Sequence, residues 1–151
     1  MKELYSKEDV KIMKNIDESY LKGESRIYEI KKFAELQGYK KIGIANCISM
    51  NKEAEKLKEI FSDKFEVYTI NCKENSIPEA EFFDDPNAKG IICNPKGQAK
   101  YLQEKGTELN IVLGLCHGHD MLFNMYSKVP TTTLVVKDKK HKHNPILELR
   151  D

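Results

Sequence analysis

The sequence lacks an excess of charge of either sign, and it lacks any long apolar run. Lys and Arg number 25 against 24 for Asp and Glu, so there is no global positive field to attract nucleic acid or a membrane surface. The longest apolar stretches, Ile111 to Cys116 and Leu134 to Val136, are far shorter than the roughly 20 residues of a membrane-spanning helix. We therefore expect neither nucleic acid nor a membrane among the partners.

Several common motifs are also missing. The first residues, MKELYSKEDVKIMK, contain no apolar run and no small-residue cleavage site, so we expect no export signal and a cytoplasmic location. No GxGxxG, GxxxxGK[ST] or GxSxG occurs, which excludes the usual nucleotide and serine-hydrolase fingerprints. The four cysteines form no CxxC pair, and stable disulfides are not expected in the cytoplasm. Their thiols should be buried, metal-bound or reactive.

Composition and periodicity predict one α/β domain over residues 1–151. A chain of 151 residues with 40% hydrophobic and 32% charged content suits a single core. Apolar side chains recur every three or four residues from Lys7 to Tyr20 and from about Ser25 to Gln37. These patterns predict two N-terminal helices, the second ended by Gly38.

Beyond residue 40, short apolar runs alternate with helical patterns. Strands are expected over residues 40–45, 65–70, 110–115 and 131–136, with a brief apolar run at 90–92. Helices are expected over residues 51–61, 96–105 and 119–126, and residues 73–89 are expected to be irregular. Such alternation predicts a three-layer, doubly wound α/β domain, in which helices cover both faces of a mainly parallel sheet.

Each cysteine follows the end of an apolar run. Cys47, Cys72 and Cys116 come just after predicted strands, and Cys93 comes just after the short run at 90–92. The carboxyl ends of parallel strands share one edge of a sheet, so we expect the four thiols to meet there. Several thiolates near helix N-termini suit an iron–sulfur cluster, with zinc as the alternative. The four cysteines are therefore the predicted metal ligands.

The segment GLCHGHD at residues 114–120 combines a thiol, two imidazoles and a carboxylate at a strand-to-helix turn. Groups of these kinds move protons and hold substrate charge, so a small-molecule substrate or ligand is the expected partner. The predicted catalytic residues are His119, Asp120 and Lys137. The predicted cofactor-binding residues at the same edge are Asn94, Gly118 and His143.

Other interpretations of these residues remain open. The cysteines could be ordinary buried thiols, since cysteine is among the residues most often found in protein cores. A metal-free cysteine-dependent enzyme would use Cys93 or Cys116 as nucleophile and His119 as base. A small-anion binding domain would use the same polar edge without chemistry. The sequence leaves the oligomeric state and the identity of the substrate undecided.

Several segments in one order resemble a known family. They are KKIGIANC, CNPKGQAKYL, TELNIVLGLCHGHD, KVPTTTLVVKD and HNP. Together they resemble domain of unknown function 1847, an uncharacterised prokaryotic family described as metal-binding, over roughly Ile27 to Leu147. The resemblance implies an α/β domain with cysteines at these four positions, the GHD of residues 118–120, and His143. Many members also begin with a cysteine-rich segment, whereas this chain has no cysteine before Cys47.

Overall fold

The computed structural model describes residues 1–20 and 22–150. The chain divides into two compact units, Met1–Lys40 and Lys41–Asp151. No helix in the described residues is both long enough and apolar enough to cross a membrane.

The first unit contains two helices, as the sequence predicts. A short 3-10 turn, Lys2–Leu4, precedes α1 (Lys7–Ser19), and α2 covers Arg26–Gln37. Helix α1 begins with a capping box, in which Ser6 Oγ accepts from the backbone N–H of Asp9 and the Asp9 carboxylate accepts from the N–H of Ser6. Helix α2 ends where Gly38 adopts a φ of 75°, a conformation that favours glycine.

The second unit is built on a parallel sheet of four strands. They are β1 (Lys41–Asn46), β2 (Glu66–Asn71), β3 (Leu109–Leu113) and β4 (Thr131–Val135). Their order in the sheet is β2-β1-β3-β4, so the chain reverses direction across the sheet between β1 and β3. Such a reversal is the topological switch point at which doubly wound domains bind ligands, at the carboxyl edge.

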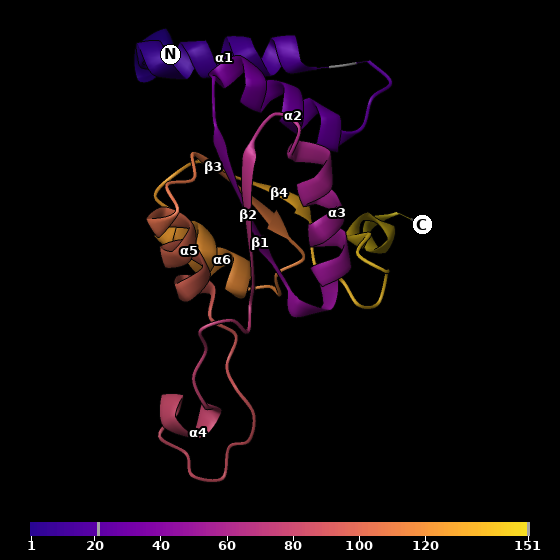
Figure 1. Ribbon diagram of the computed structural model, residues 1–151. Coiled ribbons are helices and arrows are strands. Elements are labelled where there is room, and N and C mark those ends of the chain that lie inside the picture. Colours follow the sequence, from indigo (N-terminus) through magenta and orange to yellow (C-terminus); the bar gives the residue numbers. More distant parts are fainter. Residues whose placement is uncertain (21, 151) are drawn as a thin grey trace. The chain divides into compact units, whose positions relative to one another are not determined.

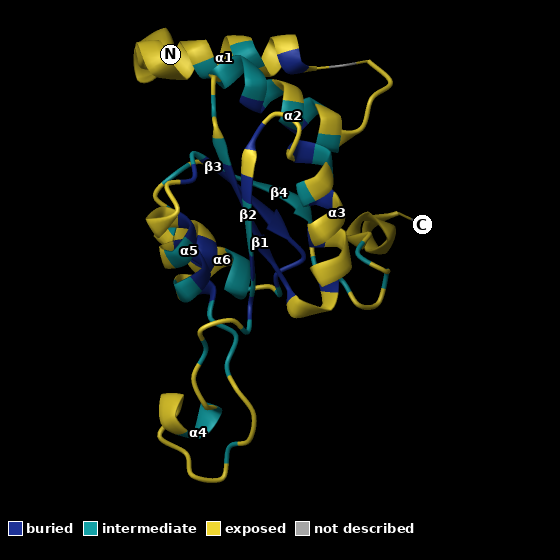
Figure 2. Cartoon of the chain, in the orientation of Figure 1, coloured by how far each residue is buried: buried dark blue, intermediate teal, exposed yellow. Residues whose placement is uncertain are grey.

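Helices cover both faces of this sheet and complete a three-layer α/β domain (Figure 1). Helix α3 (Asn51–Phe61) packs on one face, and α5 (Pro95–Glu104) packs with α6 (His119–Tyr126) on the other. The two central strands, β1 and β3, are almost entirely buried (Figure 2). The predicted fold class is therefore confirmed.

A glycine in β1 makes room for a polar side chain inside the core. A Cβ atom added at Gly43 would lie 2.2 Å from Asn110 Oδ1. Asn110, on the adjacent strand β3, is buried, and its amide is held by the hydroxyls of Thr107 and Ser127. The hydrogen bonds satisfy the buried amide, and the missing Cβ provides its space.

The expectation that Cys93, like the other cysteines, lies at the carboxyl end of a strand is wrong. Residues 90–92 do not form a strand of the sheet, because Ile91 makes only an isolated antiparallel bridge to Pro78. This bridge belongs to an extended excursion, residues 73–92, that we call the arm; it projects from the sheet and carries the short helix α4 (Glu79–Phe82) at its far end (Figure 1). Cys93 therefore follows the arm, and not a strand. Most of the arm is exposed (Figure 2), and Phe82 and Phe83 are among its exposed residues.

Candidate thiol site

Each strand delivers one chemical group to the carboxyl edge of the sheet. Cys47 follows β1 directly, Cys72 follows β2 directly, Cys116 lies three residues beyond β3, and Lys137 lies two residues beyond β4. The shared edge is a consequence of the parallel topology, which the sequence predicted. Because β1 lies between β2 and β3, Cys47 occupies a central position along this edge.

Cys47 is held among hydrogen-bond donors. Its Sγ lies 3.2 Å from the Nζ of Lys137 and 3.2 Å from the Oγ of Ser49. The same Lys137 ammonium donates to Ser49 Oγ at 2.8 Å, so the three groups form a closed triangle. The side chain is 8% exposed, which limits water around the sulfur.

This environment favours the thiolate of Cys47. Burial alone raises the pKa of the thiol, but hydrogen bonds from the side chain and backbone of Ser49, and then the hydrogen bond and charge of Lys137, more than offset it. The net effect lowers the Cys47 pKa below its ordinary value. A thiolate is the form of cysteine that attacks electrophiles and binds metals.

Cys72 and Cys93 form a neighbouring pair of thiols. Their sulfur atoms are 3.8 Å apart, and the backbone N–H of Ile48, the residue after Cys47, donates to Cys72 Sγ at 3.4 Å. Burial raises the pKa of Cys72 to about 12, and the nearby sulfurs of Cys93 and Cys47 add to the effect. The two neighbouring thiols are therefore shifted in opposite directions, with the pKa of Cys72 raised and that of Cys47 lowered.

A cavity of about 640 Å³ opens beside the Lys137 side chain. This volume is in the range of small-molecule sites. Lys137 therefore links the cavity to the Cys47 sulfur, since it lines one and contacts the other. The other lining residues are Leu115, Cys116, His117, Asp120, Val136, Asp138, Lys139 and Pro145.

Gln98 holds the ends of β1 and β2 in place. This α5 side chain is fully buried, and its Nε2 donates to the backbone carbonyls of Asn46 at 3.1 Å and Ile70 at 2.9 Å. Asn46 directly precedes Cys47, and Ile70 lies two residues before Cys72. The amide thus fixes the two strand ends that carry these thiols.

Sequence comparison identifies the family of this chain. The family described as protein of unknown function (DUF1847) matches residues 1–134. The chain belongs to the DUF1847 family. It is also 46% identical over 149 residues to an uncharacterized protein of Methanocaldococcus jannaschii, in an alignment that covers 94% of this chain and 77% of that protein. No solved structure matches the chain.

In this DUF1847 protein, three of the four predicted metal ligands belong to one buried cluster or pack against it. Cys47 and Cys72 lie in one buried cluster, and Cys93 packs against it. Cys116 instead lines the cavity. Over residues 1–20 and 22–150, no three His, Cys, Asp or Glu side chains are close enough together to hold one metal ion. A shared metal centre stays a prediction.

The predicted catalytic residues fall at different places. Lys137 contacts the Cys47 sulfur, as described above. Asp120 lines the cavity, and its Oδ1 accepts from the backbone N–H groups of Gly118 and Met121, which stabilises the turn into α6. His119 is the first residue of α6, and in the described part of the chain it makes no hydrogen bond to a cysteine sulfur. Its role as a base stays a prediction.

The predicted cofactor-binding residues stabilise backbone turns. Asn94 Oδ1 caps α5 through the Gly97 N–H, and its Nδ2 donates to the carbonyl of Asn75 in the arm. His143 Nδ1 accepts from the N–H of Asp138, just beyond Lys137. Gly118, with a φ of 88°, gives the turn before α6 its shape. Their cofactor roles stay predictions.

Two residues of the site were missed from the sequence. Ser49 lies two residues after Cys47, and this spacing at a strand end was the available signal. Gln98 lies within CNPKGQAKYL, where a polar residue breaks the apolar face of a helix. Neither signal is specific without the fold, because both are common in exposed turns and helices.

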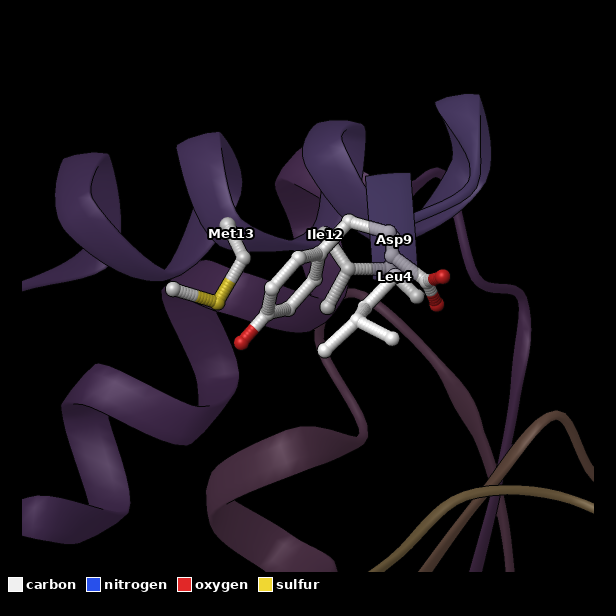
Figure 3. A pocket seen from close by; sticks show the side chains of 5 residues that line it. Leu4, Asp9, Ile12 and Met13 are labelled. Carbon is white, nitrogen blue, oxygen red and sulfur yellow. The ribbon is translucent and has the colours of Figure 1, made fainter. Parts of the chain in front are cut away.

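A second hollow lies in the first unit and carries no comparable chemistry. It has a volume of about 300 Å³ and is lined by Leu4, Tyr5, Ile12, Met13 and Asp9 (Figure 3). Asp9 carries the only carboxylate among these residues, and it is already engaged in the capping box of α1. Hydrogen bonds from the side chain and backbone of Ser6 lower the Asp9 pKa. The thiol edge is therefore the stronger candidate site.

Proposed function

We propose that this protein is a cysteine-dependent enzyme in which the Cys47 thiolate attacks a small electrophilic substrate. The observation that carries the proposal is the pair of donors, Lys137 Nζ and Ser49 Oγ, each 3.2 Å from Cys47 Sγ. Hydrogen-bond donors and a nearby cation are the features that activate nucleophilic cysteines. From the sequence, Cys93 and Cys116 were the two cysteines considered as nucleophiles. We propose Cys47 instead, because within the described residues neither Cys93 nor Cys116 receives a hydrogen bond from an ammonium or a hydroxyl group.

The surroundings of Cys47 support a binding and an orienting role for Lys137. Lys137 lines the cavity and its ammonium contacts the sulfur, so it can hold a negatively charged part of the substrate and stabilise negative charge on the leaving group. The proposal includes a cytoplasmic location, where cellular reductants keep thiols of this kind reduced.

Iodoacetamide labelling with peptide mapping tests the proposal. In the folded, reduced chain at mildly acidic pH, Cys47 should be alkylated faster than the other three cysteines. The variant Lys137→Met should slow this alkylation, whereas Lys139→Met, which also removes a cavity-lining ammonium, should leave it nearly unchanged. Equal and slow labelling of all four cysteines would refute the proposal.

We propose metal binding as a second candidate function of the same thiols. It is supported by the 3.8 Å separation of the Cys72 and Cys93 sulfurs. Two thiolates on a tetrahedral zinc ion, with Zn–S bonds of about 2.3 Å, are separated by about 3.8 Å. The pair thus supplies two ligands in position, and further ligands, from Cys47 or Cys116, would require side-chain rotation.

The metal and sulfide content of the purified protein distinguishes zinc from an iron–sulfur cluster. Protein purified anaerobically from iron- and zinc-replete cells should be analysed for both metals and for acid-labile sulfide. Metal at one equivalent without sulfide supports zinc, and iron with equal sulfide supports a cluster. Folded protein with four titratable thiols and no metal removes this second function and leaves the first intact.

A further inference from the structure

The strongest feature not used by the nucleophile is the thiol pair at the base of the arm. Cys72 is the last residue before the arm and Cys93 the first after it, and their sulfurs are 3.8 Å apart. The backbone holds this base together, because the N–H of Asn94 donates to the carbonyl of Cys72 at 2.7 Å. Within the arm, the Ile92 N–H donates to the carbonyl of Ile77. A disulfide would bring these two sulfurs from 3.8 Å to about 2.05 Å.

The pair also lies next to the nucleophile. Cys47 and Cys72 share one buried cluster, and the Ile48 N–H points at the Cys72 sulfur. That N–H can stabilise negative charge that develops on Cys72 when it acts as an attacking or leaving group. Cys72 therefore has both of the other thiols as neighbours, Cys93 at 3.8 Å and Cys47 in the same buried cluster.

We propose that the substrate of this site is a small disulfide, and that Cys72 and Cys93 supply the electrons that reduce it. The inference rests on Cys47 being the nucleophile of the proposed function. It adds the class of substrate and the class of reaction, a thiol–disulfide exchange. The cavity beside Lys137 is the entry for the substrate.

The reaction proceeds in three exchanges. The Cys47 thiolate attacks one sulfur of the substrate R–S–S–R′, forms the mixed disulfide Cys47–S–S–R and releases R′S⁻, which takes a proton from water. Cys72 then attacks the Cys47 sulfur, the Cys47–Cys72 disulfide forms, and RS⁻ leaves with the proton that Cys72 gives up. Cys93 finally attacks Cys72, loses its proton to water and restores the Cys47 thiolate.

Atoms and electrons balance over this sequence. One substrate disulfide and two protein thiols become two product thiols and one protein disulfide, Cys72–Cys93. Two electrons pass from the thiol pair to the substrate. A further turnover requires a second dithiol, small or protein-borne, to reduce Cys72–Cys93 by the same exchange chemistry.

The test uses the aromatic disulfide 5,5′-dithiobis(2-nitrobenzoate) with the reduced full-length chain, without oxygen. One equivalent should release two nitrothiobenzoate ions per protein, and peptide mapping under non-reducing conditions should find Cys72 joined to Cys93. The variant Cys72→Ser should release one ion and keep the other on Cys47. The variant Cys93→Ser should release two ions and stop at a Cys47–Cys72 disulfide.

The outcome of this test distinguishes failure of the present inference from failure of the proposed function. A probe that stays on Cys47 while Cys72 and Cys93 remain free would overturn the inference and leave the proposed function standing. A probe that first reacts with Cys93 or Cys116 would overturn both. Circular dichroism of each variant confirms that it is folded.

Discussion

The buried amide of Gln98 offers a direct test of how the thiol edge is held together. Its Nε2 bonds to the carbonyls of Asn46 and Ile70, and its Oε1 has no hydrogen-bond partner in the described structure. The substitution Gln98→Leu keeps a side chain of similar volume and removes both bonds. It therefore isolates the contribution of the amide from that of packing.

The expected loss follows from these contacts. Each buried carbonyl that loses its donor costs about 1–3 kcal/mol, or about 2–6 kcal/mol for the two. Leucine also removes the unpartnered Oε1, whose burial costs about 1–3 kcal/mol in the native protein. The net expectation is a loss of about 1–3 kcal/mol in the free energy of unfolding. The strand ends at Cys47 and Cys72 should also become less well fixed.

Urea denaturation followed by far-UV circular dichroism measures the first effect, and alkylation of Cys47 measures the second. Gln103→Leu is the matched control, because Gln103 lies on the same helix and is exposed. It should change stability by less than about 0.5 kcal/mol. A Gln98→Leu variant as stable as the native chain, with unchanged alkylation of Cys47, would refute the role assigned to this amide.

Three further predictions concern pH, the arm and the sheet. Because the Cys47 pKa is lowered, the rate of Cys47 alkylation should reach half its maximum at a pH below 9.0, the ordinary pKa of a thiol. Lys137→Met should move this midpoint to higher pH, since the variant removes a group that lowers the Cys47 pKa. An unchanged midpoint in the variant would contradict the role of the ammonium. Asn94→Ala should lower the stability of the protein by about 1 kcal/mol through loss of the α5 cap, and it should speed proteolysis of the arm. Asn94→Asp should retain most of the cap. Thermal unfolding measures the change in stability, and limited proteolysis measures the change in the arm. Gly43→Ala should destabilise the protein by about 1–3 kcal/mol, since the added Cβ would overlap Asn110 Oδ1. Adding Asn110→Ala to the same chain should relieve that overlap, so the double variant should lose less stability than the sum of the two single variants. Losses that simply add in urea denaturation would contradict this explanation.

Most of the second unit could be predicted from periodicity. The expected helix over residues 51–61 coincides with α3, and the expected strands agree with β1 to β4 within one or two residues. Local hydrophobic patterns decide such elements, and alternation of strands with helices decides a parallel sheet. The place of Cys93 was not predictable in this way, because a short apolar run such as residues 90–92 has the same composition in a strand and in the stem of an excursion.

The candidate site was only partly predictable. Cys47, Cys72 and Cys116 follow strands, so the sequence could place them at one edge. Which sulfur would be activated depends on Lys137, which comes from a strand two positions away in the sheet and reaches Cys47 across the end of β3. Pairings of that kind depend on side-chain reach and on strand order, and no local pattern encodes them.

The arm has a practical consequence for work with this protein. Its ends are fixed next to each other, whereas α4 at its tip is exposed. Surface segments with adjacent ends are the places where foreign polypeptide can be inserted with least harm to a fold. An epitope, a fluorophore or a whole reporter domain grafted in place of α4 should therefore leave the sheet and its thiols folded as they are in the native chain.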